Sequence, residues 1–260
     1  MTTSAEATGH LVVKDDASLR TIVFDRPGAR NALTKAMRDE LCALLAAAER
    51  DDTVSAVILT GTDPAFTAGV DFKDTSGGFD PYDAQFANNP GRALRAMRKP
   101  VICAVNGPCI SGGLEIALSA SFVIASERAS FADTHARLNA VPTWGLTALL
   151  PRAVGLRRAR EMSLTGELVD AQTALRIGLV NHVLPHADLL PFAEDLAARF
   201  AATPAASEIL GLYAQGIDLD ESAALGLEAA HTARRHLDTQ AFADAGRTVA
   251  AANRQPKPPA

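Results

Sequence analysis

The sequence predicts an α/β fold in which strands and helices alternate, followed by a region built of helices. Short β-branched apolar runs alternate with amphipathic helical patterns over the first half of the chain. These runs are apolar at successive positions, which is typical of parallel strands covered on both faces. Beyond about residue 140 helical patterns dominate. A chain of 260 residues that is 48% apolar can bury a substantial core.

The first elements are a strand pair, a helix and a third strand. Residues 11–13 and 21–24 have strand composition, and the polar residues 15–18 between them predict a turn. Apolar residues then recur at helical spacing up to about residue 50, and Thr34 is suited to cap that helix. The stripe consists of Met37, Leu41, Leu44, Leu45 and Ala48. Residues 54–59 predict the next strand.

The middle of the chain repeats this alternation. Residues 74–91 are rich in turn formers and predict a loop. A helix of about eight residues then precedes the buried strand 101–105. The next helix is expected over 112–120 and the next strand over 122–125.

The remaining third is expected to be helical around one short strand. The expected helices cover 146–154, 156–163, 170–177 and 187–202, the strand covers 180–184, and further helix follows Pro204. We therefore expect a core over residues 1–200 and a C-terminal helical region over 201–260 that ends in a frayed tail.

Composition excludes several classes of protein. The formal net charge of −5 and the lack of a basic stripe argue against nucleic-acid binding. No apolar run reaches the roughly 20 residues that span a bilayer, so no membrane partner is expected. The cysteines Cys42, Cys103 and Cys109 are odd in number and form no CxxC pair. A reducing, cytoplasmic location is therefore expected. No metal is expected, because Pro185 separates His182 from His186.

Two glycine-bearing turns carry the functional signal. The first is Ala68-Gly69-Val70-Asp71, and the second contains Ser111-Gly112-Gly113-Leu114-Glu115. Each closely follows a buried strand and precedes a segment that can turn helical, where backbone N–H groups lack intrahelical partners. If both turns face one point, two N–H groups can hold a carbonyl oxygen that becomes negative during a reaction. Glu115 lies one turn after Gly112 and is an acid/base group within reach of that point. The pattern indicates enolate chemistry.

Three blocks in this order resemble the enoyl-CoA hydratase/isomerase (crotonase) superfamily. They are residues 25–33 (DRPGARNAL), residues 59–61 (LTG) with 66–72 (FTAGVDF), and residues 106–107 (NG) with 111–115 (SGGLE). The similarity runs from about residue 10 to about residue 200. It implies a crotonase-like spiral of ββα units, whose C-terminal α-helical region assembles homotrimers or dimers of trimers. It also implies a coenzyme A thioester as substrate and no tightly bound cofactor.

The resemblance also implies residue roles. It assigns the oxyanion donors to the N–H groups of Val70 and Gly112, and the first catalytic glutamate to Glu115. Ala68 falls where the family's backbone meets the adenine. Ala29 and Arg30 fall where its first block runs beside coenzyme A. Asp71, in the same turn as Ala68, is grouped with these as a coenzyme A-binding residue.

One position departs from the family. Hydratases carry a second glutamate in a block resembling Phe-Gly-x-Pro-Glu, whereas residues 131–137 read FADTHAR here and put His135 in that place. An imidazole titrates near neutrality and is able to replace the carboxylate. A structural role for His135, paired with Asp133 or Glu115, is the alternative.

Two other residues leave alternatives open. Trp144 stands where the family has small residues, so its ring either narrows the acyl pocket or is an ordinary buried aromatic. Ser111, His135 and Asp133 have the residue types of a hydrolase triad. However, Cys109 interrupts the Gly-x-Ser-x-Gly pattern, which favours a turn serine.

The leading expectation is an enoyl-CoA hydratase that uses Glu115 as acid/base and His135 in place of the second glutamate. The first alternative is a 3,2-enoyl-CoA isomerase, because isomerisation requires only one base. The second alternative is a catalytically impaired acyl-CoA-binding protein that keeps the pocket.

Overall fold

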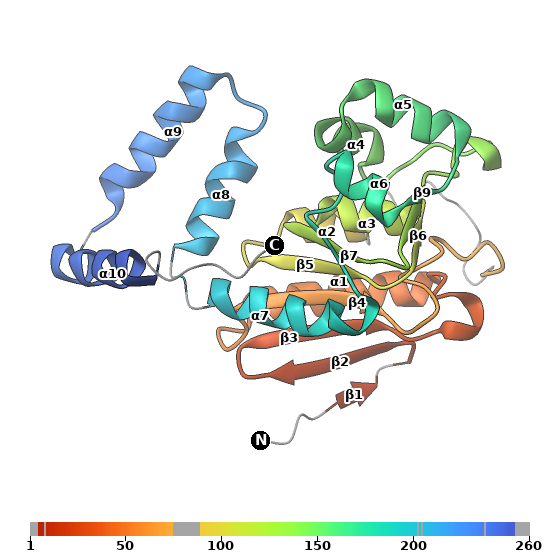
Figure 1. Ribbon diagram of the computed structural model, residues 1–260, viewed down its shortest axis with the longest axis horizontal. Helices are drawn as coiled ribbons and strands as arrows, with labels where there is room; N and C mark the ends of the chain where they lie inside the picture. The colour runs from red at the N-terminus through yellow and green to blue at the C-terminus, as the bar shows by residue number, and fades with distance from the viewer. Residues whose placement is uncertain are drawn as a thin grey trace. The chain divides into compact units, whose positions relative to one another are not determined.

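The computed structural model describes residues 5–7, 9–74, 89–201, 203, 205–236 and 238–252. Within them the main sheet has seven strands in the order β1-β2-β3-β4-β5-β7-β10 (Figure 1). The strands are Ala5–Ala7, Leu11–Asp16, Leu19–Phe24, Ala56–Gly61, Val101–Val105, Phe122–Ser126 and His182–Leu184. The first three pair antiparallel, and β3, β4, β5, β7 and β10 run parallel. The predicted α/β fold with parallel central strands is confirmed.

The first long helix, α1 (Lys35–Arg50), agrees with the sequence pattern. The Thr34 hydroxyl accepts the Met37 N–H at 3.2 Å and so caps the helix. Its buried stripe is Met37, Leu41, Leu45 and Ala48, with Leu44 partly buried. Helix position and core face were therefore both predictable from local sequence.

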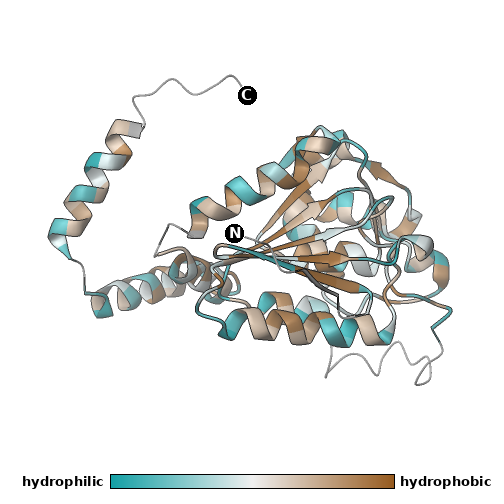
Figure 2. Ribbon diagram, turned by 90° about the horizontal axis from the view of Figure 1, so that it is seen from below, coloured by the Kyte–Doolittle hydropathy of each residue, from teal (hydrophilic) through white to brown (hydrophobic). Residues whose placement is uncertain are grey.

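The central strands are buried on both faces. Ala56 and Ile58 of β4 pack with α7 (Leu189–Ala201), whereas Val57 and Leu59 of the same strand pack on the side of α1. Figure 2 shows the hydrophobic strands in brown between helices of mixed hydropathy. Because one face of each strand meets α7 and the other meets the main core, no polar alternation is present in the strand sequences.

The helices between strands are short. They are α2 (Pro90–Arg95), α3 (Gly112–Ser119), α4 (Leu146–Val154), α5 (Leu156–Thr165) and α6 (Ala171–Arg176). Each overlaps an expected helix, and the ends differ by a few residues. The expected loop over 74–91 lies mostly outside the described residues, as does the expected tail.

The hairpin turn is tighter than expected. Strand β2 continues to Asp16 and β3 begins at Leu19, so the turn consists of Ala17 and Ser18 rather than residues 15–18. Asp15 lies in the ladder opposite Arg20, which donates to its carboxylate at 2.8 and 2.7 Å. The polar residues there occupy a solvent-facing strand end, which composition alone did not distinguish from a turn.

A second, small sheet was not predicted. It joins β6 (Pro108–Ile110), β8 (Ser130–Ala132) and β9 (Val169–Asp170) in that order. Strands of two or three residues are too short to give a periodic signal. This sheet matters for function because β6 leads into the second glycine turn and β8 leads into residues 133–135.

The chain forms two compact units, residues 1–211 and residues 212–260. The last helices are α8 (Ala206–Gly216), α9 (Glu221–Arg234) and α10 (Thr239–Ala252). Large apolar side chains stay exposed on them, among them Tyr213, Leu225 and Phe242. The expected boundary at residue 200 and the expected trimeric assembly stay predictions. Among the described residues, no helix combines the length and apolar character needed to cross a membrane.

Candidate active site

The two glycine turns lie directly against each other. Thr67 forms a parallel bridge with Cys109, and the Ile110 N–H donates to the Thr67 carbonyl at 3.1 Å. Gly69 has a φ of +86°, and a Cβ there would lie 2.8 Å from the Ile110 oxygen and 3.2 Å from the Gly112 nitrogen. Only glycine satisfies both the backbone conformation and this close approach. The structure thus brings together two segments that are about forty residues apart in the chain.

The hydrogen bonds accepted by the Gly69 and Ser111 carbonyls set the directions of the Val70 and Gly112 N–H groups. The Gly69 carbonyl accepts the Leu33 N–H at 2.8 Å, so the Val70 N–H of the same planar peptide points in the opposite direction. The Ser111 carbonyl accepts the Glu115 N–H at 2.9 Å, so the Gly112 N–H points outward from the start of α3. Val70 and Gly112 line one cavity. That both N–H groups donate to one oxygen atom stays a prediction.

Glu115 lines this cavity and is 2% exposed. Its Oε1 accepts the backbone N–H of Trp144 at 2.6 Å and that of Leu146 at 3.3 Å. Burial raises the pKa of Glu115, although the Trp144 N–H and the nearby His135 oppose the rise. The two backbone bonds fix one oxygen of the carboxyl group, which leaves Oε2 for chemistry.

His135 faces the free oxygen of Glu115. The distance from His135 Nε2 to Glu115 Oε2 is 3.8 Å, and His135 Nδ1 lies 2.5 Å from Asp133 Oδ1. Burial alone would raise the pKa of Asp133, but hydrogen bonds from His135 and Ser163 hold that pKa below its ordinary value. An ionised Asp133 only accepts hydrogen bonds, so a neutral His135 carries its proton on Nδ1. Its Nε2 is then an acceptor that faces Glu115.

A strained serine holds this histidine segment against the second turn. Ser111 has a φ of +47°, and its N–H donates to the Ala132 carbonyl at 2.8 Å. Its hydroxyl accepts the Thr134 N–H at 2.9 Å and lies 2.7 Å from the Thr134 hydroxyl. These bonds occupy the hydroxyl of Ser111 with Thr134 rather than His135. The geometry agrees with a turn serine and gives no support to a hydrolase triad.

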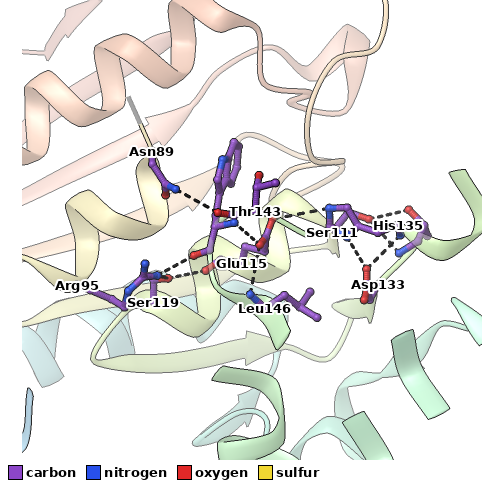
Figure 3. Close-up of polar contacts among 11 residues, drawn as sticks. Asn89, Arg95, Ser111, Glu115, Ser119, Asp133, His135, Thr143 and Leu146 are labelled. Atoms are coloured by element: carbon purple, nitrogen blue, oxygen red, sulfur yellow. Dashed lines mark hydrogen bonds and ion pairs between the residues drawn. The ribbon is translucent and has the colours of Figure 1, made fainter. Parts of the chain in front are cut away.

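The loop that anchors Glu115 is itself held from α2. Arg95 Nη1 donates to the Trp144 carbonyl at 2.7 Å and to the Ser119 hydroxyl at 2.9 Å. The Ser119 hydroxyl in turn donates to the Glu115 carbonyl at 2.8 Å. In Figure 3, Glu115 lies between Arg95 and Ser119 on one side and Asp133 and His135 on the other.

The residues expected to bind coenzyme A divide into two groups. Ala68 and Asp71 line the cavity with the catalytic candidates, whereas Ala29 and Arg30 are not among its lining residues. Arg30 nevertheless adjoins the first turn, because its carbonyl accepts the Ala68 N–H at 3.0 Å. Asp71 pairs with Arg26 at 2.5 Å. This ion pair ties residues 25–33 to the first turn and gives Asp71 a structural bond.

Trp144 is buried and forms part of the cavity wall. Its ring lies against the start of α3, since a Cβ on Gly112 would lie 2.9 Å from Trp144 Cζ3. The ring is therefore a buried aromatic that also lines the cavity, and its narrowing of an acyl pocket stays a prediction. The cavity has a volume of ≈250 Å³.

A second Ser–His–Asp grouping lies outside this cavity. His186 Nδ1 lies 3.0 Å from the Ser126 hydroxyl, and its Nε2 lies 3.0 Å from Asp63 Oδ2. Ser126 is fully buried and also accepts the Arg128 N–H at 3.1 Å. A substrate cannot reach that hydroxyl, so the grouping joins the ends of β7 and β10 and has no nucleophilic role.

Four contacts of the site were not predicted in these roles. The sequence offers Asp133 as a structural partner of His135 or as a member of a hydrolase triad, and not as the residue that orients a catalytic imidazole. The backbone N–H groups of Trp144 and Leu146 gave no signal. Arg95 gave none either, because its contact with Trp144 joins residues 49 positions apart.

The chain is similar to one family over most of its length. A family described as enoyl-CoA hydratase/isomerase matches residues 14–248. A probable peroxisomal enoyl-CoA hydratase of Arabidopsis thaliana is 34% identical over 219 residues, which cover 84% of this chain and 83% of that protein. The crystal structure of an enoyl-CoA hydratase from Mycobacterium tuberculosis is 44% identical and superposes with a TM-score of 0.74. The match covers 86% of this chain and 97% of that chain.

A structure named for a different activity is also similar. A monofunctional enoyl-CoA isomerase from M. smegmatis is 32% identical, with coverage of 83% of this chain and 97% of that chain and a TM-score of 0.72. Similarity alone therefore does not separate hydration from isomerisation, and the geometry of the proton-transfer groups must do so.

Proposed function

Because the chain belongs to the enoyl-CoA hydratase/isomerase family, we propose that it adds water to the double bond of a 2-enoyl-CoA thioester. The observation that carries this proposal is the pair of acid/base groups, Glu115 and His135, facing each other 3.8 Å apart beside two backbone donors. Hydration moves one proton from water and delivers another to carbon. Two facing groups suit that requirement.

The proposed role of the backbone donors is to hold the thioester oxygen. When water attacks the β-carbon, the electron pair of the double bond moves toward the α-carbon and the thioester oxygen. The N–H groups of Val70 and Gly112 then stabilise the resulting enolate. The positive end of α3 adds to this stabilisation. Loss of one donor of this kind typically costs on the order of 10²–10³ in rate.

The proton transfers balance within the pair. His135 Nε2 accepts a proton from water as the water oxygen bonds to the β-carbon. Protonated Glu115 donates the proton on Oε2 to the α-carbon, and burial increases the protonated fraction because it raises the pKa of Glu115. The product is a 3-hydroxyacyl-CoA, with an imidazolium and a carboxylate left behind. Transfer of the proton from Nε2 back to Oε2 restores both groups.

Asp133 supports this cycle as a positioning residue. Its carboxylate lies 2.5 Å from His135 Nδ1 and also accepts the His135 backbone N–H at 3.1 Å. The short contact favours the Nδ1–H tautomer and stabilises the imidazolium that forms. His135 thus presents an acceptor nitrogen, Nε2, for the task that the second glutamate has in the family's hydratases.

We propose that coenzyme A is the carrier portion of the substrate rather than a resident cofactor. Ala68, Ala29 and Arg30 would lie beside it, a proposal supported by the bond between Ala68 and Arg30 next to the oxyanion donors. Asp71 would contribute to coenzyme A binding mainly through its ion pair with Arg26. The trimeric assembly and the cytoplasmic location stay predictions, and the Arabidopsis relative is named peroxisomal.

Isomerisation of a 3-enoyl-CoA is the second candidate. Glu115 alone, with one oxygen anchored and the other open to the cavity, is able to carry a proton between two carbons. The similarity to a monofunctional isomerase also favours it. Hydration is preferred because the Asp133–His135 pair would have no task in a one-base reaction.

The test follows both reactions in parallel. Purified protein is incubated with 2-butenoyl-CoA in ¹⁸O-labelled water, and the product is examined for a labelled 3-hydroxyl group. A 3-enoyl-CoA is incubated separately and examined for a shift of the double bond. We expect the wild-type protein to form labelled 3-hydroxyacyl-CoA. The rate of its formation should fall by about 10²–10⁴ in Glu115→Gln and in His135→Asn. His182→Asn, which changes an exposed histidine of β10, serves as the matched control.

Other outcomes separate the candidates. A shift of the double bond without incorporation of ¹⁸O, abolished by Glu115→Gln but not by His135→Asn, supports the isomerase. Calorimetric binding of 2-butenoyl-CoA without turnover of either substrate supports the impaired acyl-CoA-binding protein.

A further inference from the structure

The wall of the cavity near α1 carries basic side chains. Lys35 and Arg38, one turn apart on α1, line the same cavity as the oxyanion donors and Glu115. Val70, Phe72, Leu138, Val141 and Trp144 supply large apolar side chains to the lining. An arginine in such surroundings requires an explanation, because a desolvated charge is costly unless it is paired.

The guanidinium of Arg38 is incompletely satisfied. Its Nε is buried and has no hydrogen-bond partner among the described residues. Its Cζ lies 5.9 Å from the centroid of the Trp144 ring, a cation–π contact that supplies no hydrogen-bond acceptor. Burial lowers the pKa of Arg38, but an arginine stays charged in proteins. A cation is thus held in the cavity wall with donor capacity unused.

The neighbouring charges on the same wall have partners of their own. Lys35 Nζ pairs with Asp39 at 2.6 Å. Asp74 accepts the Lys35 backbone N–H at 2.6 Å, and Asp71 pairs with Arg26 at 2.5 Å. Asp39 and Asp74 also act on Arg38 through their charge, but neither accepts a hydrogen bond from its Nε.

Trp144 connects Arg38 to the reacting end of the cavity. The Cζ3 edge of its ring lies against Gly112, whereas the Arg38 guanidinium lies over the ring. An acyl chain whose thioester oxygen meets the Gly112 N–H therefore reaches Arg38 after passing along one indole. One indole ring separates Gly112 from the Arg38 guanidinium. That separation suits a short acyl chain.

Building on the proposed hydratase function, we propose that Arg38 binds a carboxylate at the far end of the acyl chain. The preferred substrate is then a short 2-enoyl-CoA that carries a terminal carboxylate. A planar guanidinium matches a carboxylate through parallel N–H donors. A methyl group at the same place offers the guanidinium no acceptor and therefore gains none of these charge-assisted bonds. Arg38 is thus a specificity-determining residue.

The first experiment measures binding without turnover. Calorimetry compares glutaryl-CoA with pentanoyl-CoA, two saturated thioesters that have the same number of acyl carbons and differ by the terminal carboxylate. We expect the wild-type protein to bind glutaryl-CoA about 10- to 100-fold more tightly. Arg38→Met should abolish this preference, and Arg38→Lys should restore part of it. Arg50→Met, an exposed arginine at the end of the same helix, should retain it.

The second experiment repeats the comparison with reactive substrates. The kcat/KM ratio of glutaconyl-CoA to 2-pentenoyl-CoA should exceed 10 in the wild-type protein and fall toward one in Arg38→Met. Thermal melting of each variant establishes that it is folded, and Arg38→Lys replaces Arg38→Met if the latter is not.

The outcomes separate this inference from the proposed hydratase function. Equal binding of glutaryl-CoA and pentanoyl-CoA by the wild-type protein overturns the role of Arg38, even if hydration occurs. A preference that persists in both Arg38 variants also overturns it. An Arg38-dependent preference in binding, without turnover of either enoyl-CoA, supports the carboxylate site and rejects the hydratase.

Discussion

The backbone N–H of Trp144 donates to Oε1 of Glu115 at 2.6 Å, while the indole ring of the same residue forms the wall between Gly112 and Arg38. One loop residue therefore orients the proposed acid and shapes the acyl site. Arg95 holds the carbonyl of that residue. Substitutions around this loop are expected to affect catalysis and substrate choice separately.

Replacing Glu115 with glutamine should stabilise the folded protein at neutral pH. Burial raises the pKa of Glu115 above its ordinary value of 4.5, so the native state binds more protons than the unfolded state between those two values. The free energy of unfolding therefore falls as the pH rises from the ordinary pKa of Glu115 to its raised pKa. Above the raised pKa this loss of stability is complete. A glutamine avoids the buried charge and keeps an oxygen for the Trp144 N–H.

We expect Glu115→Gln to melt a few degrees higher than the wild type at pH 7.5, since about 1 kcal/mol corresponds to roughly 2–4 °C in a chain of this size. The difference should shrink as pH falls toward 4.5. Calorimetric melts across this pH range provide the measurement. A variant that melts lower than the wild type at pH 7.5 would show that the buried carboxylate is stabilising.

Replacing Asp133 with asparagine should impair His135 without removing it. An asparagine amide that donates to Nδ1 forces the imidazole proton onto Nε2, which is the wrong tautomer for accepting a proton from water. We expect kcat to fall about 10²-fold or more, with a smaller change in KM. Nitrogen NMR of the imidazole reports the tautomer directly. Full activity with an Nε2–H imidazole would remove the proton-acceptor role from His135.

Replacing Gly69 with alanine should damage both stability and activity. The φ of +86° and the 2.8 Å approach of the Ile110 oxygen leave no room for a Cβ unless the two turns separate. We expect a loss of about 1–3 kcal/mol in the free energy of unfolding, together with most of the turnover. Chemical denaturation measures the first effect. Gly226→Ala is the matched control, because nothing lies within 4 Å of a Cβ there. If both variants were equally stable, the close approach of the Ile110 oxygen to residue 69 would not contribute to stability.

Replacing Arg95 with methionine should release the loop that anchors Glu115. The change removes the bonds to the Trp144 carbonyl and the Ser119 hydroxyl, and also a positive charge that interacts with Glu115. We expect kcat to fall about 10-fold with little change in KM. The pKa of Glu115 in the pH profile of kcat should rise, because less positive charge then favours its carboxylate.

Two variants control this experiment. Arg95→Lys should restore part of kcat and of the pH profile, whereas Arg92→Met changes an exposed arginine of the same helix and should alter neither. An unchanged pH profile in Arg95→Met would limit Arg95 to a structural role.

The parts of the fold that depend on local sequence were predictable. Thr34 and the apolar stripe of α1 specify that helix through contacts within a few residues. The β-branched runs of β4 and β5 identify buried parallel strands. The site was predictable where backbone conformation requires glycine, as at Gly69.

The rest depends on contacts between distant segments. The strands of the small sheet are too short to carry a pattern, although they lead into Ser111 of the cavity wall and into Asp133, which bonds His135. In the sequence, Arg95 and Arg38 look like ordinary surface arginines of helical segments. Only the folded chain shows that one meets the Trp144 carbonyl and the other the Trp144 ring. The orientation of His135 could not be predicted either, because it requires the positions of both neighbouring carboxyl groups.

Both proposed oxyanion donors belong to the main chain, and this has an evolutionary consequence. A point mutation exchanges a side chain but leaves the amide of that residue in place, unless proline is introduced. The side chain of Val70 is therefore free to vary with the shape of the acyl group, while the amide beneath it is inherited unchanged. New substrate preferences can arise on this scaffold without rebuilding the site where negative charge is held.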